Sequence, residues 1–322
     1  MADYLAVDVG GTEIKYGVIS SDGHLKESQK QPTPDNLRAF TQLIQSLIDH
    51  YHEQVSGYAF SVPGKIDTKT ETISFGGALT YLDGVCMPKA LETYGKGLSV
   101  QNDGKAAALA ELWLGNLKGI DNGVAMILGT GVGGGIILDG QLRLGPHFQA
   151  GEFSFMSSDY SADDYACAGF TNSAVGMVKR INRTLGSDNI GDGKAAFAAI
   201  HAGNKQAVSI FEAYCQAIAN QILSIQGILD VKRFVIGGGI SAQTILIDEI
   251  NRQFKALITS NPILDVNMPK DIEIMATRFG NDANLYGALY HFLQKQKAND
   301  DELLETTKKL IDNMGVSISF LV

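Results

Sequence analysis

Residues 8–15 read DVGGTEIK and directly follow an apolar run at residues 4–7. Residues 129–135 read GTGVGGG and follow a second apolar run at residues 124–128. Each stretch has the pattern of a strand, a glycine turn and a second strand, and an Asp-Gly hairpin signal follows it, at 22–23 or at 139–140. The Gly-Thr pairs begin at positions 11 and 129, which are 118 residues apart. Two copies predict a duplicated unit that handles a nucleotide.

The glycine turns have a chemical use beyond turning the chain. Without a Cβ, backbone N–H groups approach an anion closely, and the threonine hydroxyl adds a donor. Two such turns facing each other would clamp a polyphosphate, although each taken alone is equally typical of a tight hairpin. Asp8 ends an otherwise apolar strand, and a hydrated Mg²⁺ would account for a carboxylate in that position.

Composition narrows the class of protein. The chain has 322 residues, of which 45% are hydrophobic and 19% charged, which is typical of a globular protein of about two domains. A net charge of −9 disfavours a nucleic-acid partner. No apolar run approaches the ~18 residues that span a bilayer, so no membrane partner is expected. We expect a cytoplasmic protein.

The three cysteines, Cys86, Cys167 and Cys215, are widely spaced and have no histidine at metal-ligand spacing. This arrangement indicates neither a disulfide framework nor a zinc site. Buried thiols in a reducing compartment are the expectation.

In the first half of the chain, apolar spacing predicts a helix over residues 36–51 and a strand over residues 57–62 that stops at Pro63-Gly64. A further strand, 98–101, stops at Asn102-Asp103, and the helix-forming run 104–114 follows. The Asn-Asp pair therefore lies at a strand-to-helix junction, the usual position of ligand groups in α/β sheets. An N-cap role for Asp103 is the alternative, and the two roles are compatible.

In the second half, residues 205–229 have a long helical pattern, and the strand 234–236 runs into three glycines at 237–239. A strand at 272–276 and a helix from about 281 to 296 end the compact part. A charged helical stretch, 300–314, and an apolar end, 316–322, follow without an assigned role.

With DVGGTEIK, the Asn102-Asp103 pair, GTGVGGG and the late glycine run in this order, the chain resembles the ROK family of sugar kinases over about residues 4–296. That family belongs to the actin/hexokinase-like ATPase superfamily. The resemblance implies a two-lobed α/β, ribonuclease H-like fold with an active-site cleft between the lobes. It assigns residues 1–117 and 281–297 to one lobe and 118–280 to the other, with 298–322 as an extension.

The resemblance also implies cofactors and the residues that bind them. ATP would be the phosphoryl donor, and Asp8 would hold Mg²⁺ through water. Residues from both lobes would bind the nucleotide: Gly10, Gly11, Thr12, Lys15, Thr130, Gly131 and Gly238.

For the acceptor, the resemblance makes Asp103 the base that takes the proton of the attacking sugar hydroxyl. Gly64, Asn102 and Glu152 would hold the sugar together with Asp103. Phosphoryl transfer mainly needs positioning and charge neutralisation, so Asp103 need not have an unusual pKa.

The sequence departs from the family pattern after Glu152. Many ROK proteins have a histidine three residues later and a CxCGxxGC motif, which together bind zinc. Here Phe155 replaces the histidine, and residues 165–172 retain one cysteine. We therefore expect no zinc, and the second sugar-binding acid of the family cannot be placed.

The lost groups face the anomeric end of the sugar in the family. An apolar wall there would tolerate a substituent at C1, and residues 73–84, ISFGGALTYLDG, resemble those of ROK β-glucoside kinases. The hypothesis is phosphorylation at the 6-hydroxyl of the non-reducing glucose of a β-glucoside such as cellobiose. The alternative is that Phe155 packs in a core and the pocket keeps a monosaccharide.

Other functions remain open. A glucokinase, a fructokinase or an N-acetylmannosamine kinase would share the mechanism. A sugar-sensing ROK transcriptional regulator is remote, because the phosphate motif begins at Asp8 and the chain is acidic. A sugar-binding protein without catalysis is disfavoured, because the carboxylates and both turns are present. The helical surface of the second lobe would allow a homodimer, although such helices are more often intramolecular.

Overall fold

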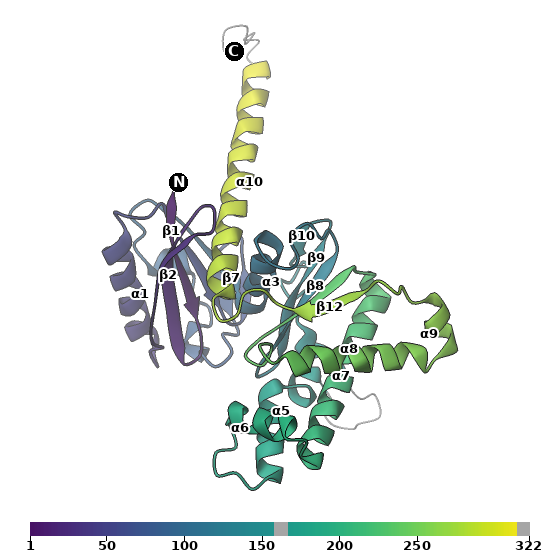
Figure 1. Ribbon diagram of the computed structural model, residues 1–322. Helices are drawn as coiled ribbons and strands as arrows, with labels where there is room; N and C mark the ends of the chain where they lie inside the picture. The colour runs from purple at the N-terminus through teal and green to yellow at the C-terminus, as the bar shows by residue number, and fades with distance from the viewer. Residues whose placement is uncertain (158–166, 314–322) are drawn as a thin grey trace.

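The computed structural model describes residues 1–157 and 167–313, with side chains described up to residue 306. Two five-stranded sheets form the two lobes (Figure 1), which confirms the predicted α/β class. The first sheet has the order β3-β2-β1-β4-β7: β1 Asp3–Val9, β2 Glu13–Ser20, β3 Leu25–Pro32, β4 Gly57–Val62 and β7 Gly97–Asn102. The second has the order β10-β9-β8-β11-β12: β8 Gly123–Leu128, β9 Val132–Leu138, β10 Gln141–Arg143, β11 Arg233–Gly237 and β12 Glu273–Ala276.

The two sheets share one topology, as the repeated glycine motif predicts. In each, three antiparallel strands linked by tight turns are followed by two parallel strands, because β1 pairs with β4 and β4 with β7, while β8 pairs with β11 and β11 with β12. A two-stranded ribbon, β5 Lys65–Asp67 and β6 Thr72–Ser74, follows β4. The carboxyl ends of the parallel strands in each sheet therefore lie along one edge, where α/β proteins bind ligands.

The helices are distributed unevenly over the lobes. On the first sheet side lie α1 Leu37–Tyr51, η1 Thr80–Leu82, α2 Met87–Ala90 and α3 Asp103–Trp113. The second lobe contains η2 Phe153–Phe155, α4 Ala168–Thr171, α5 Ala174–Thr184, α6 Gly193–His201, α7 Lys205–Leu229, α8 Thr244–Thr259 and α9 Pro262–Asn267. The last described helix is α10, Ala283–Asn313.

Alternation along β1 explains how both faces of the first sheet are covered. Leu5 and Val7 point into a core with α1, whereas Tyr4 and Ala6 point into a core with α10. A strand buried on both faces must be apolar throughout, apart from groups with a specific partner. That requirement makes Asp8, in the same strand, conspicuous.

Helix α3 lies between the lobes and packs against α10 on one side and β9 on the other (Figure 1). Glycines permit this close approach. A Cβ on Gly104 would lie 2.7 Å from the Gly134 nitrogen, and a Cβ on Gly287 would lie 1.7 Å from the Ala106 oxygen. The contacts of α3 on both sides therefore bring backbone against backbone.

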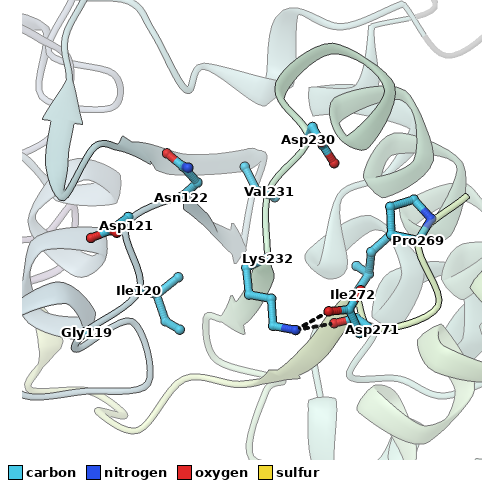
Figure 2. Close-up of a pocket in the computed structure, with 10 residues that line it drawn as sticks. All are labelled: Gly119, Ile120, Asp121, Asn122, Asp230, Val231, Lys232, Pro269, Asp271 and Ile272. Atoms are coloured by element: carbon cyan, nitrogen blue, oxygen red, sulfur yellow. Dashed lines mark hydrogen bonds and ion pairs between the residues drawn. The ribbon is translucent and has the colours of Figure 1, made fainter.

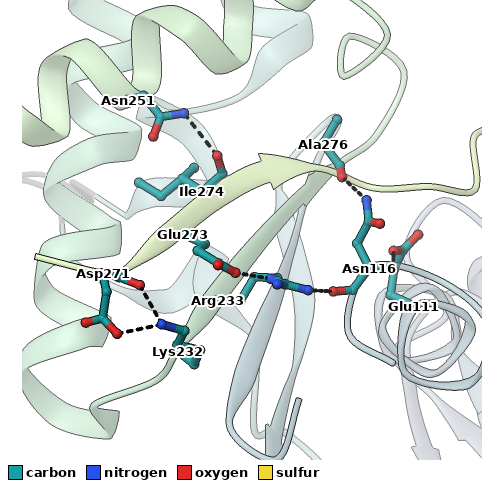
Figure 3. A network of polar contacts seen from close by, with 9 residues as sticks. All are labelled: Glu111, Asn116, Lys232, Arg233, Asn251, Asp271, Glu273, Ile274 and Ala276. Atoms are coloured by element: carbon teal, nitrogen blue, oxygen red, sulfur yellow. Dashed lines mark hydrogen bonds and ion pairs between the residues drawn. The ribbon is translucent and has the colours of Figure 1, made fainter. Parts of the chain in front are cut away.

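The chain crosses between the lobes after α3 and again before α10, and a buried carboxylate joins the two crossovers. Glu111 accepts hydrogen bonds from the N–H groups of Asn116 (2.7 Å), Arg278 (2.8 Å) and Phe279 (3.1 Å). Figure 3 shows how the network continues: the Asn116 side chain donates to the Ala276 carbonyl, and Arg233 reaches the Asn116 carbonyl.

Two sequence expectations are wrong in detail. The helix expected to end at about residue 296 continues without a break to Asn313, so the charged stretch belongs to α10 and projects beyond the body (Figure 1). Lys, Glu and Leu sustain a helix even where no apolar face is needed. Cys215 is buried as expected, but Cys86 and Cys167 are partly exposed. Within the described residues, no helix is both long and apolar enough to cross a membrane.

Candidate active site

The four residues expected to hold a sugar line one cavity of about 230 Å³: Gly64, Asn102, Asp103 and Glu152. Lys65, Phe75, Gln149 and Phe155 complete the lining. The loop that contains Gln149 and Glu152 follows β10 of the second sheet, whereas Asn102 ends β7 of the first. The cavity therefore lies between the two lobes.

The strand-to-helix junction directs Asp103 into this cavity. The Asn102 side chain accepts a hydrogen bond from the Lys105 N–H at 3.1 Å, so Asn102 is the N-cap of α3 and the N-cap alternative for Asp103 is wrong. The Asn102 amide donates to the Gly64 carbonyl (2.9 Å) and to Asp103 Oδ1 (3.0 Å). Because Asn102 caps the helix, Asp103 is available for a ligand.

Burial raises the pKa of Asp103 to about 6, and the nearby negative charges of Asp8 and Glu152 act in the same direction. The hydrogen bond from the Gly104 N–H and the charge of Lys105 oppose the rise. The sequence does not show that Asp103 is buried, nor that it lies near two other carboxylates, so this raised pKa was not foreseen. A value near the working pH suits a group that accepts a proton.

Glu152 is held by a buried cation. Lys105 Nζ lies 2.6 Å from Glu152 Oε1, and Lys105 is only 1% exposed. Lys105 was not among the expected site residues. A usable signal exists, because it is one of two charged residues, with Glu111, in the apolar run 104–114, and both are buried in α3.

Gly64 has a backbone reason to be glycine. Its φ is +101°, and a Cβ would lie 2.5 Å from the Phe75 carbonyl oxygen. Its own carbonyl receives the Asn102 amide. Gly64 therefore shapes the cavity wall and helps to orient Asn102.

A second cavity, of about 210 Å³, contains Asp8 and Gly238. Residues from both lobes line it: Asp8, Ala107, Ile127, Gly237, Gly238, Gly239, Thr277, Phe279, Gly280, Asn281, Ala283 and Asn284. A cavity of about 480 Å³ shares Thr277 and Gly280 with it. We call these two adjacent cavities the recess, which lies between the glycine run after β11 and the start of α10.

Asp8 is a buried carboxylate that accepts hydrogen bonds through one of its two oxygens. Ser61 (2.9 Å) and the Asn284 amide (3.0 Å) both donate to its Oδ1, and among the described residues no hydrogen bond reaches Oδ2. The parallel register, which pairs Asp8 with Ser61, places the first donor. Burial raises the pKa of Asp8, while Asn284, Ser61 and the charge of Lys15 lower it. Ser61 and Asn284 were not expected from the sequence.

The remaining expected nucleotide residues line neither cavity. Gly10, Gly11 and Thr12 form the turn between β1 and β2, and Thr130 and Gly131 form the turn between β8 and β9. Both turns follow strands whose carboxyl ends lie at the cavity edge of their sheets. Lys15 instead binds the start of α10, donating to the Asn281 carbonyl at 2.8 Å and pairing with Asp282 at 3.1 Å.

Phe155 is 67% exposed and lines the sugar-site cavity, so the alternative that it packs in a core is wrong. Of the residues around the lost zinc motif, 158–166 lie outside the described part of the chain. In the described part, no group of three or more His, Cys, Asp or Glu side chains is placed to hold a metal ion. The absence of zinc therefore stays a prediction, and a hydrated Mg²⁺ does not require such a group.

A further cavity of about 430 Å³ lies at the other end of the second sheet, where β8, β11 and β12 begin (Figure 2). It is lined by residues such as Asp121, Asp230 and Lys232, and Lys232 pairs with Asp271 there. None of the expected site residues lines this cavity. The candidate active site lies at the opposite edge of the second sheet, where the parallel strands end.

Two sheets of one topology, with carboxylates between them at the strand ends, are the architecture of the actin/hexokinase-like fold. The ROK family model matches residues 4–295, and the chain belongs to the ROK family. The family match confirms the predicted family, and the topology confirms the predicted fold. The kinases among the relatives named below confirm the predicted enzyme class.

Named relatives match nearly the whole chain. It is 30% identical to the β-glucoside kinase of Klebsiella pneumoniae over 305 residues, covering 92% of this chain and 98% of that protein. The β-glucoside kinase of Listeria monocytogenes is 28% identical (92% and 99% covered) and the glucokinase of Streptomyces coelicolor 26% (88% and 95%). A ROK family protein from Streptococcus pneumoniae, solved in complex with sucrose, superposes with a TM-score of 0.84 at 27% identity (92% and 99%).

Proposed function

We propose that this ROK protein is an ATP-dependent sugar kinase that phosphorylates the 6-hydroxyl of the non-reducing glucose of a β-glucoside such as cellobiose. The observation that carries the proposal is the position of Asp103. Its carboxylate lines a sugar-sized cavity with Asn102 and Glu152, and its pKa of about 6 suits proton transfer.

In the proposed reaction, Asp103 accepts the proton of the attacking hydroxyl. That oxygen forms a bond to the γ-phosphorus, the bond from the γ-phosphorus to the β,γ-bridging oxygen breaks, and ADP leaves. Asn102 and Glu152 orient the sugar by hydrogen bonds to its hydroxyls. Closure of the two lobes over the sugar would exclude water, which would otherwise compete as an acceptor.

The nucleotide is assigned to the recess that contains Asp8 and Gly238. The turns at Gly10, Gly11 and Thr12 and at Thr130 and Gly131 would bind its phosphates through backbone N–H groups, while Lys15 would add positive charge near Asp8. Three carboxylates, Asp8, Asp103 and Glu152, make this region negative. A polyphosphate therefore needs a cation beside it.

Mg²⁺ fits the groups present. Asp8 Oδ2 accepts no hydrogen bond from a described residue, and Asp8 lines the recess. This hard oxygen donor would hold a hydrated Mg²⁺ through water. The ion, when bound, neutralises phosphate charge as the phosphoryl group moves.

The β-glucoside acceptor is supported by the cavity wall and by the relatives. Phe155 replaces a polar wall and is exposed rather than packed in a core, and two relatives are β-glucoside kinases. A glucokinase is the second candidate, because the Streptomyces coelicolor relative carries that name.

ADP release with Mg-ATP across a panel tests the proposal: glucose, fructose, N-acetylmannosamine, cellobiose, gentiobiose and an aryl β-glucoside. We expect the highest kcat/KM with the β-glucosides and a 6-phosphate product by NMR. A hundredfold preference for free glucose, about 2.7 kcal/mol, would reject the β-glucoside acceptor and retain the kinase. If no acceptor leads to ADP release, both the β-glucoside acceptor and the kinase activity are rejected.

A further inference from the structure

Two phenylalanines at the sugar-site cavity remain largely exposed. Phe75 is 72% and Phe155 67% exposed, and both line the cavity. Phe75 follows β6 on the first-lobe side, whereas Phe155 ends η2 on the second. We call these two residues the aromatic rim.

Phe75 is held in an unfavourable backbone conformation. Its φ is +53°, a left-handed value that is unfavourable for a bulky residue. The Asp83 carboxylate accepts a hydrogen bond from the Phe75 N–H at 3.0 Å, and Gly64 leaves room for the Phe75 carbonyl. An exposed ring gains little from burial, so folding alone does not explain why this conformation is maintained.

A cation supports the Phe75 ring. Lys65 Nζ lies 5.4 Å from the ring centroid, and the antiparallel pairing of β5 with β6 brings Lys65 opposite Ser74, the residue before Phe75. Lys65 also lines the cavity. The ring is therefore fixed from two sides, by its backbone and by a cation–π contact.

The size of the cavity limits what lies inside it. Its volume of about 230 Å³ is below the ~300 Å³ at which pockets for drug-sized ligands begin. A cavity of this volume suits one pyranose ring beside Asp103 and Glu152, and a second ring would then lie at the opening. The aromatic rim lines this cavity and has free surface for such a ring.

We propose that the aromatic rim is a subsite for a second pyranose ring, joined through C1 to the glucose that Asn102, Asp103 and Glu152 hold. The C–H groups on the face of a pyranose are weakly positive and pack on the negative face of an aromatic ring. The subsite lies on both lobes, so the second ring would bridge them. This inference rests on the proposed kinase function and deepens it, because it names the residues that select a disaccharide.

The test compares kcat/KM for cellobiose with kcat/KM for glucose in Phe75→Ala, Phe155→Ala and the double variant. We expect the cellobiose-to-glucose ratio to fall about three- to tenfold in each single variant, the effect of one aromatic contact, and further in the double variant. Phe75→Tyr, which keeps the ring, should retain the ratio. Phe170→Ala is the matched control, because Phe170 is 78% exposed and does not line the cavity.

The subsite would be overturned if kcat/KM fell equally for cellobiose and glucose. An unchanged cellobiose-to-glucose ratio in the double variant would overturn it as well. Cellobiose binding, measured as inhibition of glucose phosphorylation, separates this inference from the acceptor assignment. If the wild type phosphorylates only glucose, a cellobiose inhibition constant that rises at least threefold in the Ala variants still supports the rim. An inhibition constant that these variants do not change, or no cellobiose binding at all, overturns it.

Discussion

Lys105 Nζ and Glu152 Oε1 lie 2.6 Å apart, and this ion pair joins the helix that begins at Asp103 to the loop that follows the second hairpin of the other lobe. The lysine is almost fully buried, whereas the glutamate side chain is 25% exposed at the cavity. The pair thus fixes the distance between the proposed base and the proposed sugar-binding carboxylate.

Glu152→Ala removes the partner of a buried cation. We expect a decrease of about 3 kcal/mol in the free energy of unfolding, because the Lys105 charge is then uncompensated, and a rise in KM for the sugar. Denaturant unfolding measures the first effect, and adding Lys105→Met to the Glu152→Ala variant should restore part of the lost stability. Asp265→Ala, which breaks the exposed pair with Lys270, is the control and should cost at most about 1 kcal/mol.

Asp103→Asn should lower kcat about 10²- to 10⁴-fold with little change in sugar affinity, because the lost group acts mainly in the transition state. In the wild type, kcat/KM should fall about tenfold per pH unit below a pKa of about 6. Steady-state kinetics from pH 5 to 8 measure both. Full activity in the Asn variant would exclude Asp103 as the base, and Asp121→Asn, in the cavity of Figure 2, serves as control.

The same substitution should change stability in a pH-dependent way. The pKa of Asp103 is raised from 3.8 to about 6, so the ionised carboxylate is disfavoured in the folded state and stability is lost as pH rises between these values. Asp103→Asn removes this pH-dependent loss of stability. The unfolding free energy of the Asn variant minus that of the wild type should therefore increase by up to about 3 kcal/mol between pH 4 and pH 7. A constant difference across this range would contradict the raised pKa.

The adjacent glycines 238 and 239 allow a matched comparison in the proposed nucleotide site. Gly238 has a φ of +100°, and a Cβ there would lie 2.1 Å from the Leu128 carbonyl oxygen, whereas a Cβ on Gly239 meets nothing within 4 Å. Gly238→Ala should cost about 1–3 kcal/mol of stability and raise KM for ATP. Gly239→Ala should change stability by less than about 0.5 kcal/mol. Thermal unfolding of the two variants side by side would show whether they differ.

Features carried by local pattern were predictable from the sequence. Helix α7 has the bounds expected, 205–229, and the strands that end at Val62 and Asn102 were expected within one residue. Apolar periodicity and glycine breaks determine such elements locally. Asp8 was identified as a carboxylate at the end of an apolar strand, and the Asn102-Asp103 pair by its place at a strand-to-helix junction.

Features that depend on contacts distant in sequence were not predictable. Asn284 donates to Asp8 across 276 positions, and Lys105 reaches Glu152 across 47. Neither partner belongs to a pattern that periodicity detects. The raised pKa of Asp103 likewise depends on its burial and, to a smaller extent, on Asp8 and Glu152, and only the fold produces both.

The glycine contacts of α3 have a consequence for how the lobes can move. Shear motion requires packed side chains that readjust as one surface slides over another. On α3, Gly104 meets the Gly134 backbone and Ala106 meets Gly287, so no layer of side chains is available to readjust there. We therefore expect closure over a sugar to be a hinge rotation located in residues 114–122 and 277–282. Crystal structures with and without sugar would contradict this if α3 slid along β9. If α3 keeps its contacts with β9, it is the rigid element about which the two lobes rotate.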